Sequence, residues 1–430
     1  MMLKKEQSYI TEVLKQIKSK EAKENIEAEL RHHLQETKCT LIKDGLTEEE
    51  ADEKATVQMG NPTKLGIELN LLHRPRIDWM MLTLLIVTFG LSYLPMLTIP
   101  SIMNGGIYTG SYYLVNKVII ILLGMSIVTG IMFLDYRKLR NFQWVFFGLA
   151  IFIFLLLVFV PTSYMHWGPK LDIGSLTIES SMALPFLYLF WAILLNNKKV
   201  NVWKVGLAFT VTFFFLQFLG SSTFLLIYVI MVFSMVVWRL RKAAGPVIGL
   251  FTFVCLLGVV PFVSTKEYWL SRIAAFVNPD QDPQGMGYMY LQVKELMQNA
   301  GLFGNRNSNK IDFLPESHTD FVFVNFTYHY GWVLAGILVL ILALLLARMI
   351  VSIEKIKDPF GKTLIVGGAA IFSVQFIFNI AMTIGLLPMT AMPLPFISYG
   401  LMPTMLNSLI VGIFLSVYRR KDIVRYEASV

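Results

Sequence analysis

The sequence predicts an all-α membrane protein. We expect a polytopic helix bundle with about ten transmembrane helices, a large extracellular loop between spans 7 and 8, and a small cytosolic helical unit at the N-terminus. Hydrophobic residues make up 55% of the 430 residues and charged residues only 15%, which is less charge than soluble domains carry. Apolar runs of about 20 residues recur, each long enough to cross a bilayer as a helix. Basic residues gather in alternate loops between these runs.

Residues 1–74 are expected to form the cytosolic helical unit. Thr47 with Glu50 predicts a capping box at the start of a helix, Gly60 predicts a C-terminal cap, and Pro62 predicts a stop. We expect so short a unit to bury little core of its own. Apolar residues recur at helical spacing before the capping box: Ile10, Val13, Leu14 and Ile17, then Ile26, Leu30, Leu34 and Leu41.

Histidine and cysteine residues give no strong metal motif. His32, His33 and Cys39 could suggest zinc, but without a second pair of ligands they fit better with the solvated side of a helix. Cys39 and Cys255 lie far apart in a polar and an apolar stretch, so we expect neither a disulfide nor a metal site. The formal net charge of +8 comes from loops of the membrane part and does not indicate nucleic acid.

The membrane domain is expected to cover residues 75–422. The fifth and sixth spans are the weakest, because they are short and separated only around Gly220. The ten predicted spans run near 79–99, 115–134, 143–162, 178–196, 203–219, 221–238, 246–264, 321–347, 363–386 and 397–417.

The loops predict the orientation of the chain. The segments "DYRKLRN", "NNKKVNVWK", "RLRKAAG" and "RMIVSIEKIKDPFGK" follow the even-numbered spans and are basic, as is the C-terminal "YRRKDIVRYE". The alternate loops "IPSIMNGGIYTGSYY" and "GLLPMTAMPLPFI" carry no charge. This positive-inside pattern predicts that both termini are cytoplasmic.

The same orientation places the long loop 265–320 outside the cell. A loop of that length is usually functional or disordered. Its stretch "YMYLQVKELMQNAGLFG" has apolar residues near helical spacing, which predicts a short helix at the membrane interface. The residues at this spacing are Tyr290, Val293, Leu296 and Met297.

Three motifs in the C-terminal half resemble those of a known family. "NRNSNKIDFLPESHTDFVF" and "NIAMTIGLLPMTAMPLPFISYG" are similar to the two signatures of the FtsW/RodA type, the SEDS (shape, elongation, division, sporulation) family. "RIAAFVNPDQDPQGMGY", before them, resembles a third motif of that family. The resemblance covers about residues 77–420, and the N-terminal unit looks like the small helical prefix found before some bacterial permeases.

The resemblance implies a function in bacterial cell-wall synthesis, cell shape or cell division. Members of the family are peptidoglycan glycosyltransferases of the cytoplasmic membrane. They polymerise lipid II, an undecaprenyl-diphosphate-linked precursor, into glycan strands at the outer membrane face, beside a class B penicillin-binding protein. On this resemblance, Asp320 stands at the position of the aspartate that polymerisation requires.

The residues themselves leave alternatives open around Asp320. Transfer of a sugar from a lipid diphosphate needs a base for the acceptor hydroxyl, and an oriented carboxylate can serve. Asp320 could instead be the N-cap of the helix that follows. Glu316 could orient a partner, bind a cation, or be an exposed turn carboxylate. His318 is expected to satisfy a local hydrogen bond rather than to titrate.

Further candidates would bind substrate. Charge on a diphosphate leaving group is stabilised by cations or a metal. A divalent cation is therefore an alternative to protein side chains, although no cofactor is required by the sequence. The candidate diphosphate contacts are Arg272 and Lys310, with Arg306 as a third, and each could also be a solvated charge or a contact to membrane lipids. Polar candidates facing the bundle or lining a cavity are Asn379, Gln375, Ser398 and Tyr399.

Several charged groups of the family pattern are absent. By position, the glutamate and lysine of one family motif fall on Met182 and Pro185, whereas Glu179 takes the place of a glutamine. Phe218 stands where an aspartate is expected, and "YHYG" at 328–331 replaces "EELG". These differences leave three hypotheses open: a lipid II polymerase, a catalytically reduced scaffold or regulatory protein of cell-wall synthesis, and a flippase for a lipid-linked precursor. The scarcity of charges along the spans and the lack of an internal repeat favour polymerase over transport.

Overall fold

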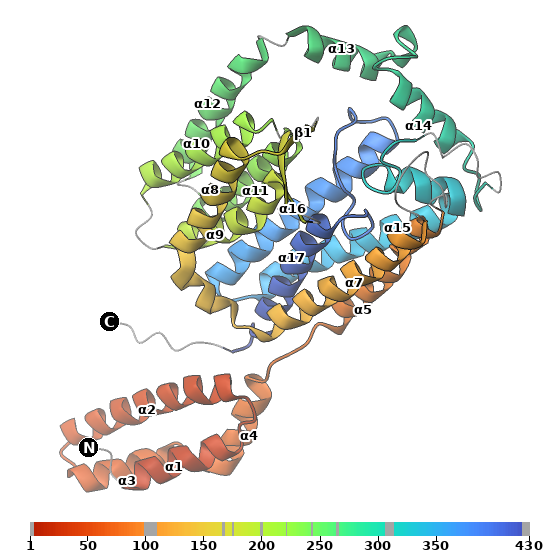
Figure 1. Ribbon diagram of the computed structural model, residues 1–430. Coiled ribbons are helices and arrows are strands. Elements are labelled where there is room, and N and C mark those ends of the chain that lie inside the picture. The colour runs from red at the N-terminus through yellow and green to blue at the C-terminus, as the bar shows by residue number, and fades with distance from the viewer. Residues whose placement is uncertain are drawn as a thin grey trace. The chain divides into compact units, whose positions relative to one another are not determined.

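The computed structural model describes residues 4–98, 110–165, 168–173, 176–197, 201–220, 222–241, 244–263, 266–305 and 314–423. The chain forms two compact units (Figure 1). One comprises residues 1–78 with 355–358 and 417–430, and the other comprises 79–354 and 359–416. The expected domain boundary after residue 74 stays a prediction.

The N-terminal part consists of helices α1 (Lys4–Lys15), α2 (Lys20–Lys43), α3 (Glu48–Gln58) and α4 (Pro62–Leu72). The capping box of Thr47 and Glu50 is confirmed at the start of α3. Gly60 has a positive φ of 79° just after that helix, as expected of a C-terminal cap. Pro62 is the first residue of α4, where Asn61 caps the helix, so the interpretation of Pro62 as a stop is incomplete.

These helices share a hydrophobic core, contrary to the expectation that the unit would bury little. The predicted faces of α1 and α2 supply most of it, and Leu14 and Leu41 are partly buried against it. His33 and Cys39 are exposed, consistent with a solvated helix side. The buried residues of this hydrophobic core are Tyr9, Ile10, Val13, Ile17, Ala22, Ile26, Leu30, Leu34 and Ala55.

The membrane unit is built almost entirely of helices, which confirms the predicted fold class. It begins with α5 (Trp79–Leu91), α6 (Leu94–Leu97), α7 (Gly110–Phe133), the 3-10 turn η1 (Tyr136–Phe142), α8 (Gln143–Phe159), η2 (Ser180–Ala183), α9 (Leu184–Asn196), α10 (Val202–Phe218), α11 (Ser222–Leu240) and α12 (Ala244–Val263). It continues with α13 (Lys266–Val277), η4 (Pro279–Gln281), α14 (Tyr288–Gln298), α15 (Val322–Ser352), η6 (Ile353–Lys355), α16 (Pro359–Thr383) and α17 (Leu401–Arg419).

A helix lies at each of the ten positions where a span was expected. Within the described residues, seven helices are long and apolar enough to cross a membrane. The shorter apolar helices are those at 180–196, 203–218 and 245–256. An integral membrane protein is thus established, whereas the count of ten spans stays a prediction.

Helices α16 and α17 form the interior of the membrane unit (Figure 1). In their most apolar windows, 67% and 72% of the residues are buried, against 17–39% in the other long spans. Helix α16 packs on α9, α11 and α15. The segment between α16 and α17, residues 384–400, is therefore anchored at both ends in the best-packed part of the unit.

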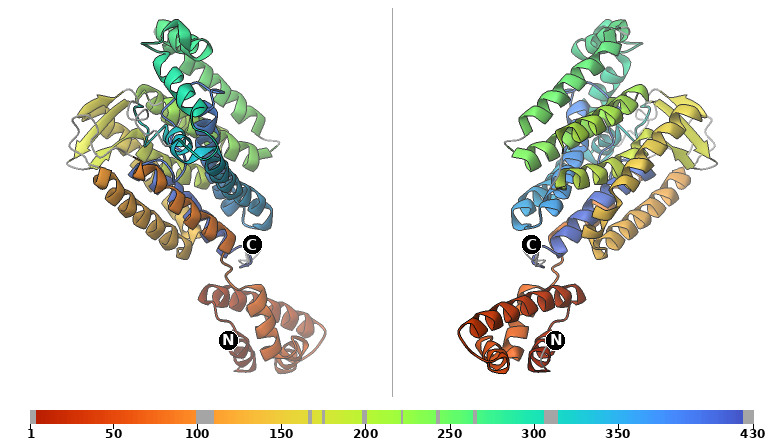
Figure 2. Two further views of the ribbon diagram at one scale, coloured as in Figure 1. Left: turned by 90° about the vertical axis from the view of Figure 1, so that its right-hand side faces the viewer. Right: turned by 90° about the vertical axis from the view of Figure 1, so that its left-hand side faces the viewer.

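A small antiparallel sheet follows α8, which the sequence did not predict. Strands β1 (Ser163–Met165), β2 (Gly168–Ile173) and β3 (Leu176–Ile178) are ordered β1-β2-β3. Ser163 pairs with Lys170, and Leu171 pairs with Ile178. Figure 2 shows the sheet at the margin of the helical unit. It leads directly into Glu179 and the start of α9.

The described residues of the long loop 265–320 include two α-helices, α13 and α14. The expected short helix is confirmed as α14, with Val293, Leu296 and Met297 buried. Helix α13 was not predicted, although its sequence "KEYWLSRIAAFV" is amphipathic. The described end of this loop, residues 314–321, leads into α15.

Candidate functional site

Two segments that are far apart in sequence are hydrogen-bonded to each other at the start of α15. The Ser398 hydroxyl donates to the carbonyl of Thr319 at 2.6 Å. The Tyr399 N–H donates to the carbonyl of His318 at 2.8 Å. Ser398 Oγ also accepts a hydrogen bond from the N–H of Leu394 at 2.8 Å. One hydroxyl therefore stabilises the turn 394–398 and also binds the segment that contains Thr319. The structure thus brings the predicted residues Ser398 and Tyr399 beside the segment that carries Asp320.

Asn379 joins the same two segments from α16. Its side-chain Nδ2 donates to the carbonyl of Asp320 at 2.8 Å and to the carbonyl of Met392 at 2.6 Å. The side chain is fully buried, so both bonds form away from water. Asn379 therefore holds the backbone of Asp320 in place. The other predicted polar residue of α16, Gln375, accepts a hydrogen bond from Asn407 of α17 at 2.9 Å.

The carboxyl group of Asp320 lies in a poorly hydrated place near other negative charges. Burial first, and then the charges of Glu316 and Glu179, together raise the pKa of Asp320 to about 7. Asp320 does not cap α15, whose N-cap residue is Phe321 and has no side-chain capping bond. The N-cap alternative for Asp320 is therefore wrong.

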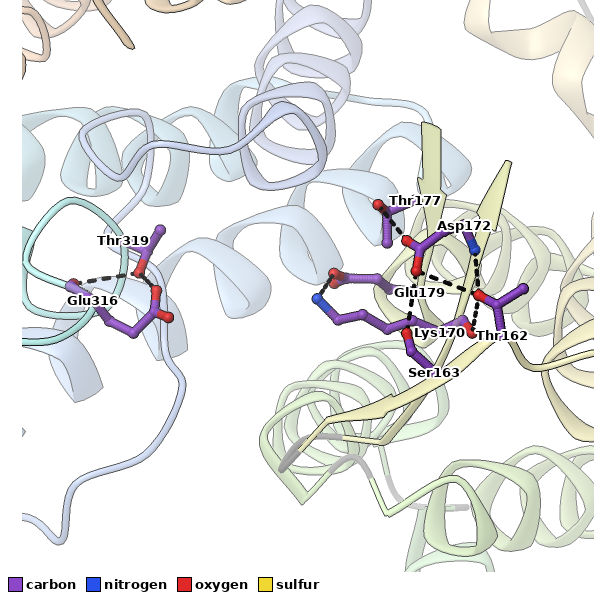
Figure 3. Close-up of polar contacts among 8 residues, drawn as sticks. All are labelled: Thr162, Ser163, Lys170, Asp172, Thr177, Glu179, Glu316 and Thr319. Carbon is purple, nitrogen blue, oxygen red and sulfur yellow. Dashed lines mark hydrogen bonds and ion pairs between the residues drawn. The ribbon is translucent and has the colours of Figure 1, made fainter. Parts of the chain in front are cut away.

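Glu316 adopts a conformation that is uncommon for its residue type. Its φ is 54°, in the left-handed region. The Glu316 carboxylate accepts a hydrogen bond from the Thr319 hydroxyl at 2.5 Å (Figure 3). The backbone carbonyl of Glu316 accepts the N–H groups of Thr319 and Phe321. Glu316 closes the turn 316–321 and adds negative charge beside Asp320.

Glu179 is paired with a lysine from the unpredicted sheet. Lys170 Nζ lies 2.7 Å from Glu179 Oε1, and both side chains are mostly buried (Figure 3). On the same sheet, Asp172 accepts hydrogen bonds from the hydroxyls of Thr177, Thr162 and Ser163, at 2.8–3.3 Å. The sheet thus supplies Glu179 with a counter-ion. Lys170 was not a sequence candidate, because only the strand pairing places it near Glu179.

His318 belongs to an aromatic cluster with Tyr113 and Tyr399. Its ring centroid lies 5.2 Å from that of Tyr113 and 5.8 Å from that of Tyr399. Burial lowers the pKa of His318, with Glu316 acting in the opposite direction. Nδ1 is buried and has no hydrogen-bond partner among the described residues. The lowered pKa favours the neutral ring, which contributes packing and the polar atom Nδ1.

Arg272 lies on α13 and reaches the segment 384–400. Its guanidinium donates to the carbonyl of Met389 at 2.7 Å, and the N–H of Met389 donates to the Tyr290 hydroxyl at 3.0 Å. Both backbone polar groups of Met389 are thus held by side chains of the long loop. The other candidate cations, Lys310 and Arg306, lie outside the described residues.

The carboxylates of this region do not form a protein-only metal site. Glu316 and Glu179 raise the pKa of Asp320, yet no group of three or more histidine, cysteine, aspartate or glutamate side chains is placed to hold a metal ion within the described residues. A divalent cation bound by substrate phosphates stays a prediction, and the chemistry below does not pass through one.

One buried cation near the site was missed by sequence reasoning. Lys117 of α7 is fully buried, and its Nζ donates to the carbonyls of Phe396, Ile397 and Ser398. The signal was a single lysine within the apolar run "YYLVNKVIIILLG". The site thus combines the Asp320 carboxyl group, whose pKa is near 7, with a backbone that is held by side chains of α7, α13 and α16. The side chains from α7 and α13 are the basic residues Lys117 and Arg272.

Comparison with known proteins finds relatives along most of the chain. It is 26% identical over 317 residues to stage V sporulation protein E of Bacillus subtilis, covering 69% of this chain and 84% of that protein. It is 26% identical over 374 residues to "Probable peptidoglycan glycosyltransferase FtsW" of Geobacter metallireducens, covering 83% of this chain and 98% of that protein.

Solved structures show the same fold. A chain of the structure reported as "Structural coordination of polymerization and crosslinking by a peptidoglycan synthase complex" superposes with a TM-score of 0.65 at 21% identity, covering 80% of this chain and 98% of its own. The rod shape determining protein RodA of Thermus thermophilus superposes with a TM-score of 0.56 at 18% identity, covering 82% and 98%.

The family whose model matches residues 78–423 is described as "Cell cycle protein". Since that match covers most of the chain and includes the three motifs, the protein belongs to the FtsW/RodA/SpoVE family, the SEDS family that its sequence resembles.

Proposed function

We propose that this protein polymerises lipid II into peptidoglycan glycan strands at the outer face of the cytoplasmic membrane. The acceptor hydroxyl attacks C1 of the lipid-linked sugar and its proton passes to the carboxylate of Asp320. The new bond joins the acceptor oxygen to C1, and the bond from C1 to the diphosphate oxygen breaks. Undecaprenyl diphosphate leaves with the electron pair. Family membership and the relatives named as peptidoglycan glycosyltransferases support this reaction.

The observation that carries the proposal is the state of Asp320. A general base works best when its pKa lies near the operating pH, because it is then deprotonated and still basic enough to accept a proton. Burial and two neighbouring carboxylates raise the pKa of Asp320 to about 7. A purely structural surface aspartate needs no such environment.

The predicted substrate residues divide into two roles under this proposal. Arg272 and Lys310 are proposed to bind the diphosphate, because cations stabilise the departing charge. Glu316, His318 and Tyr399 are proposed to bind the sugar. The predicted site residues Asn379 and Ser398 are proposed to position the Asp320 backbone instead, since their polar atoms are already engaged there.

The expected cellular setting completes the proposal. Both termini face the cytoplasm, and a class B penicillin-binding protein is the partner that cross-links the product strands. Similarity to a chain of a peptidoglycan synthase complex supports such a partner. The basic loops after the even-numbered spans support the orientation.

The test is glycan synthesis by the purified protein from fluorescent lipid II, with and without a penicillin-binding partner. We expect long glycan products on a gel, and we expect Asp320→Asn to reduce the rate by at least about a hundredfold because the base is removed. Asp172→Asn is the matched control, since that carboxylate is exposed and, among the contacts described above, bonds only to the hydroxyls of Thr162, Ser163 and Thr177. Equal activity of wild type and Asp320→Asn would contradict the assignment of the base.

A scaffold is the second candidate, favoured by the loss of the charged groups at Met182, Pro185 and Phe218. It predicts no glycan under any partner or cation, while the protein still binds the penicillin-binding protein. A flippase predicts movement of labelled lipid II between leaflets without polymer. These outcomes are separable in the same reconstituted vesicles.

A further inference from the structure

Lys117 is a fully buried lysine in a helix that is otherwise apolar. Its side chain has no exposed surface. Nζ donates to the carbonyls of Phe396 at 3.0 Å, Ile397 at 3.1 Å and Ser398 at 3.0 Å. A lysine ammonium has three donors and no acceptor, so these three bonds use its full capacity. Nζ is therefore bonded to the protein backbone and does not extend toward solvent.

The contact compensates for an unfavourable backbone. Phe396 has a φ of 64°, in the left-handed region that bulky residues avoid. Residues 396–398 turn three consecutive carbonyls toward one point, where their partial negative charges repel. A single ammonium among them offsets that repulsion, and it also satisfies carbonyls that have no water available.

This turn is linked directly to the segment that carries Asp320. The carbonyl of Ser398 accepts a bond from Lys117, while the hydroxyl of Ser398 donates to the carbonyl of Thr319. The backbone N–H of Tyr399 donates to the carbonyl of His318. Asp320 is the residue that follows Thr319. A path of two consecutive hydrogen bonds therefore runs from Lys117 through Ser398 to Thr319, and a parallel bond joins Tyr399 to His318.

We propose that Lys117 is the positioning residue of the site. It holds the carbonyls of residues 396–398 in place, and the segment 396–399 then holds the backbone at 318–320. It acts through other residues and touches no reacting atom. Its effect on rate rests on the proposed polymerase function, whereas its effect on backbone order does not. The length of the side chain and its three N–H donors are both required, because Nζ must reach all three carbonyls at once.

Hydrogen exchange followed by mass spectrometry tests the structural half without any substrate. Lys117→Met keeps an unbranched apolar chain of similar length, so the helix still packs, but it removes the donors. We expect peptides covering 388–400 and 314–321 to exchange at least about tenfold faster, because the amides of Leu394, Ser398 and Tyr399 lose support. Helix α16 should exchange at the wild-type rate.

Two further variants sharpen the comparison. Thr129→Ala lies on the same helix, where its hydroxyl bonds only within α7 among the described residues, and it should change neither peptide. Lys117→Arg keeps a buried cation with several donors and should restore protection in part. If Lys117→Met leaves both peptides at wild-type rates, or accelerates exchange throughout the molecule, the positioning role is wrong.

Activity provides the second readout. With lipid II, Lys117→Met should lower kcat by about a hundredfold, the loss expected when a reacting group is misplaced, with little change in KM. Ser398→Ala interrupts the same path, so the double variant should lose little more than Lys117→Met alone. Additive losses would contradict a shared path. If the wild type makes no glycan, the polymerase proposal fails while the exchange experiment still decides the role of Lys117.

Discussion

At the scale of single residues, the charge on Asp320 depends on its neighbours. Its pKa is raised to about 7 by burial first, and then by the charges of Glu316 and Glu179. A base must be deprotonated to act, so the rate should rise with pH up to about 7 and level off above it. The ion pair between Glu179 and Lys170 moderates this effect, because the ammonium offsets part of the Glu179 charge.

We therefore predict that Glu179→Gln shifts the pH–rate profile toward lower pH. The substitution removes the negative charge of Glu179, which raises the pKa of Asp320 in the wild type, so the pKa of Asp320 falls. The measurement is kcat/KM for lipid II polymerisation between pH 5 and 9. Asp172→Asn is the control on the same sheet, and its profile should coincide with that of the wild type. A shift toward higher pH in Glu179→Gln would contradict the electrostatic account.

Prediction from sequence succeeded for some of these residues and failed for others, for physical reasons. The cluster around Asp320 was found because carboxylates beside an apolar run are unusual. Lys117 was passed over because one lysine hardly changes the hydropathy of a 20-residue run, and its carbonyl partners lie about 280 positions away in sequence. Lys170 was missed because a pairing of strands brings it to Glu179.

At the scale of elements, helix α15 is interrupted close to the site. Gly331 has φ 84° and ψ 168°, which a helix cannot contain. After the interruption, the amides of Trp332 and Val333 donate to the carbonyls of Gly301 and Leu302 in the long loop. The interruption thus attaches the loop to the helix that follows Asp320. Sequence periodicity predicted a continuous span here, because it records apolar spacing and not backbone breaks.

We predict that Gly331→Ala destabilises this attachment by roughly 2 kcal/mol, since the residue has a conformation that only glycine adopts readily. A Cβ atom there would also lie 2.3 Å from the Leu302 carbonyl oxygen and 2.4 Å from the Gly304 nitrogen. The measurement is hydrogen exchange of the amides of residues 332 and 333 together with thermal unfolding in detergent.

Gly336→Ala provides the matched control for that prediction. It lies in the regular part of the same helix, where an added Cβ meets nothing within 4 Å. Alanine favours helix there by up to about 1 kcal/mol, so this variant should be as stable as the wild type or more so. Equal behaviour of the two variants would show that the interruption does not hold the loop.

At the scale of the whole molecule, the side on which the site lies depends on how many helices cross the membrane. The long loop 265–320 follows seven predicted spans, and three of the ten positions hold helices shorter than the long spans. If an odd number of these short helices did not cross the membrane, a cytoplasmic N-terminus would place the loop 265–320 in the cytoplasm. The all-α fold and the positions of the helices could be predicted because length and hydropathy dominate membrane insertion. The small sheet could not, because three short strands leave little periodic signal.

The central claim is that Asp320 faces the outside of the cell, where glycan strands are made. The most direct test is labelling of intact cells with a membrane-impermeant maleimide. Gln284→Cys, in a background without Cys39 and Cys255, places a thiol at an exposed position of the long loop. Native Cys39, also exposed, reports the N-terminal unit in a Cys255→Ser background. We predict that Gln284→Cys is labelled in intact cells and Cys39 only after permeabilisation; the reverse pattern would contradict the account.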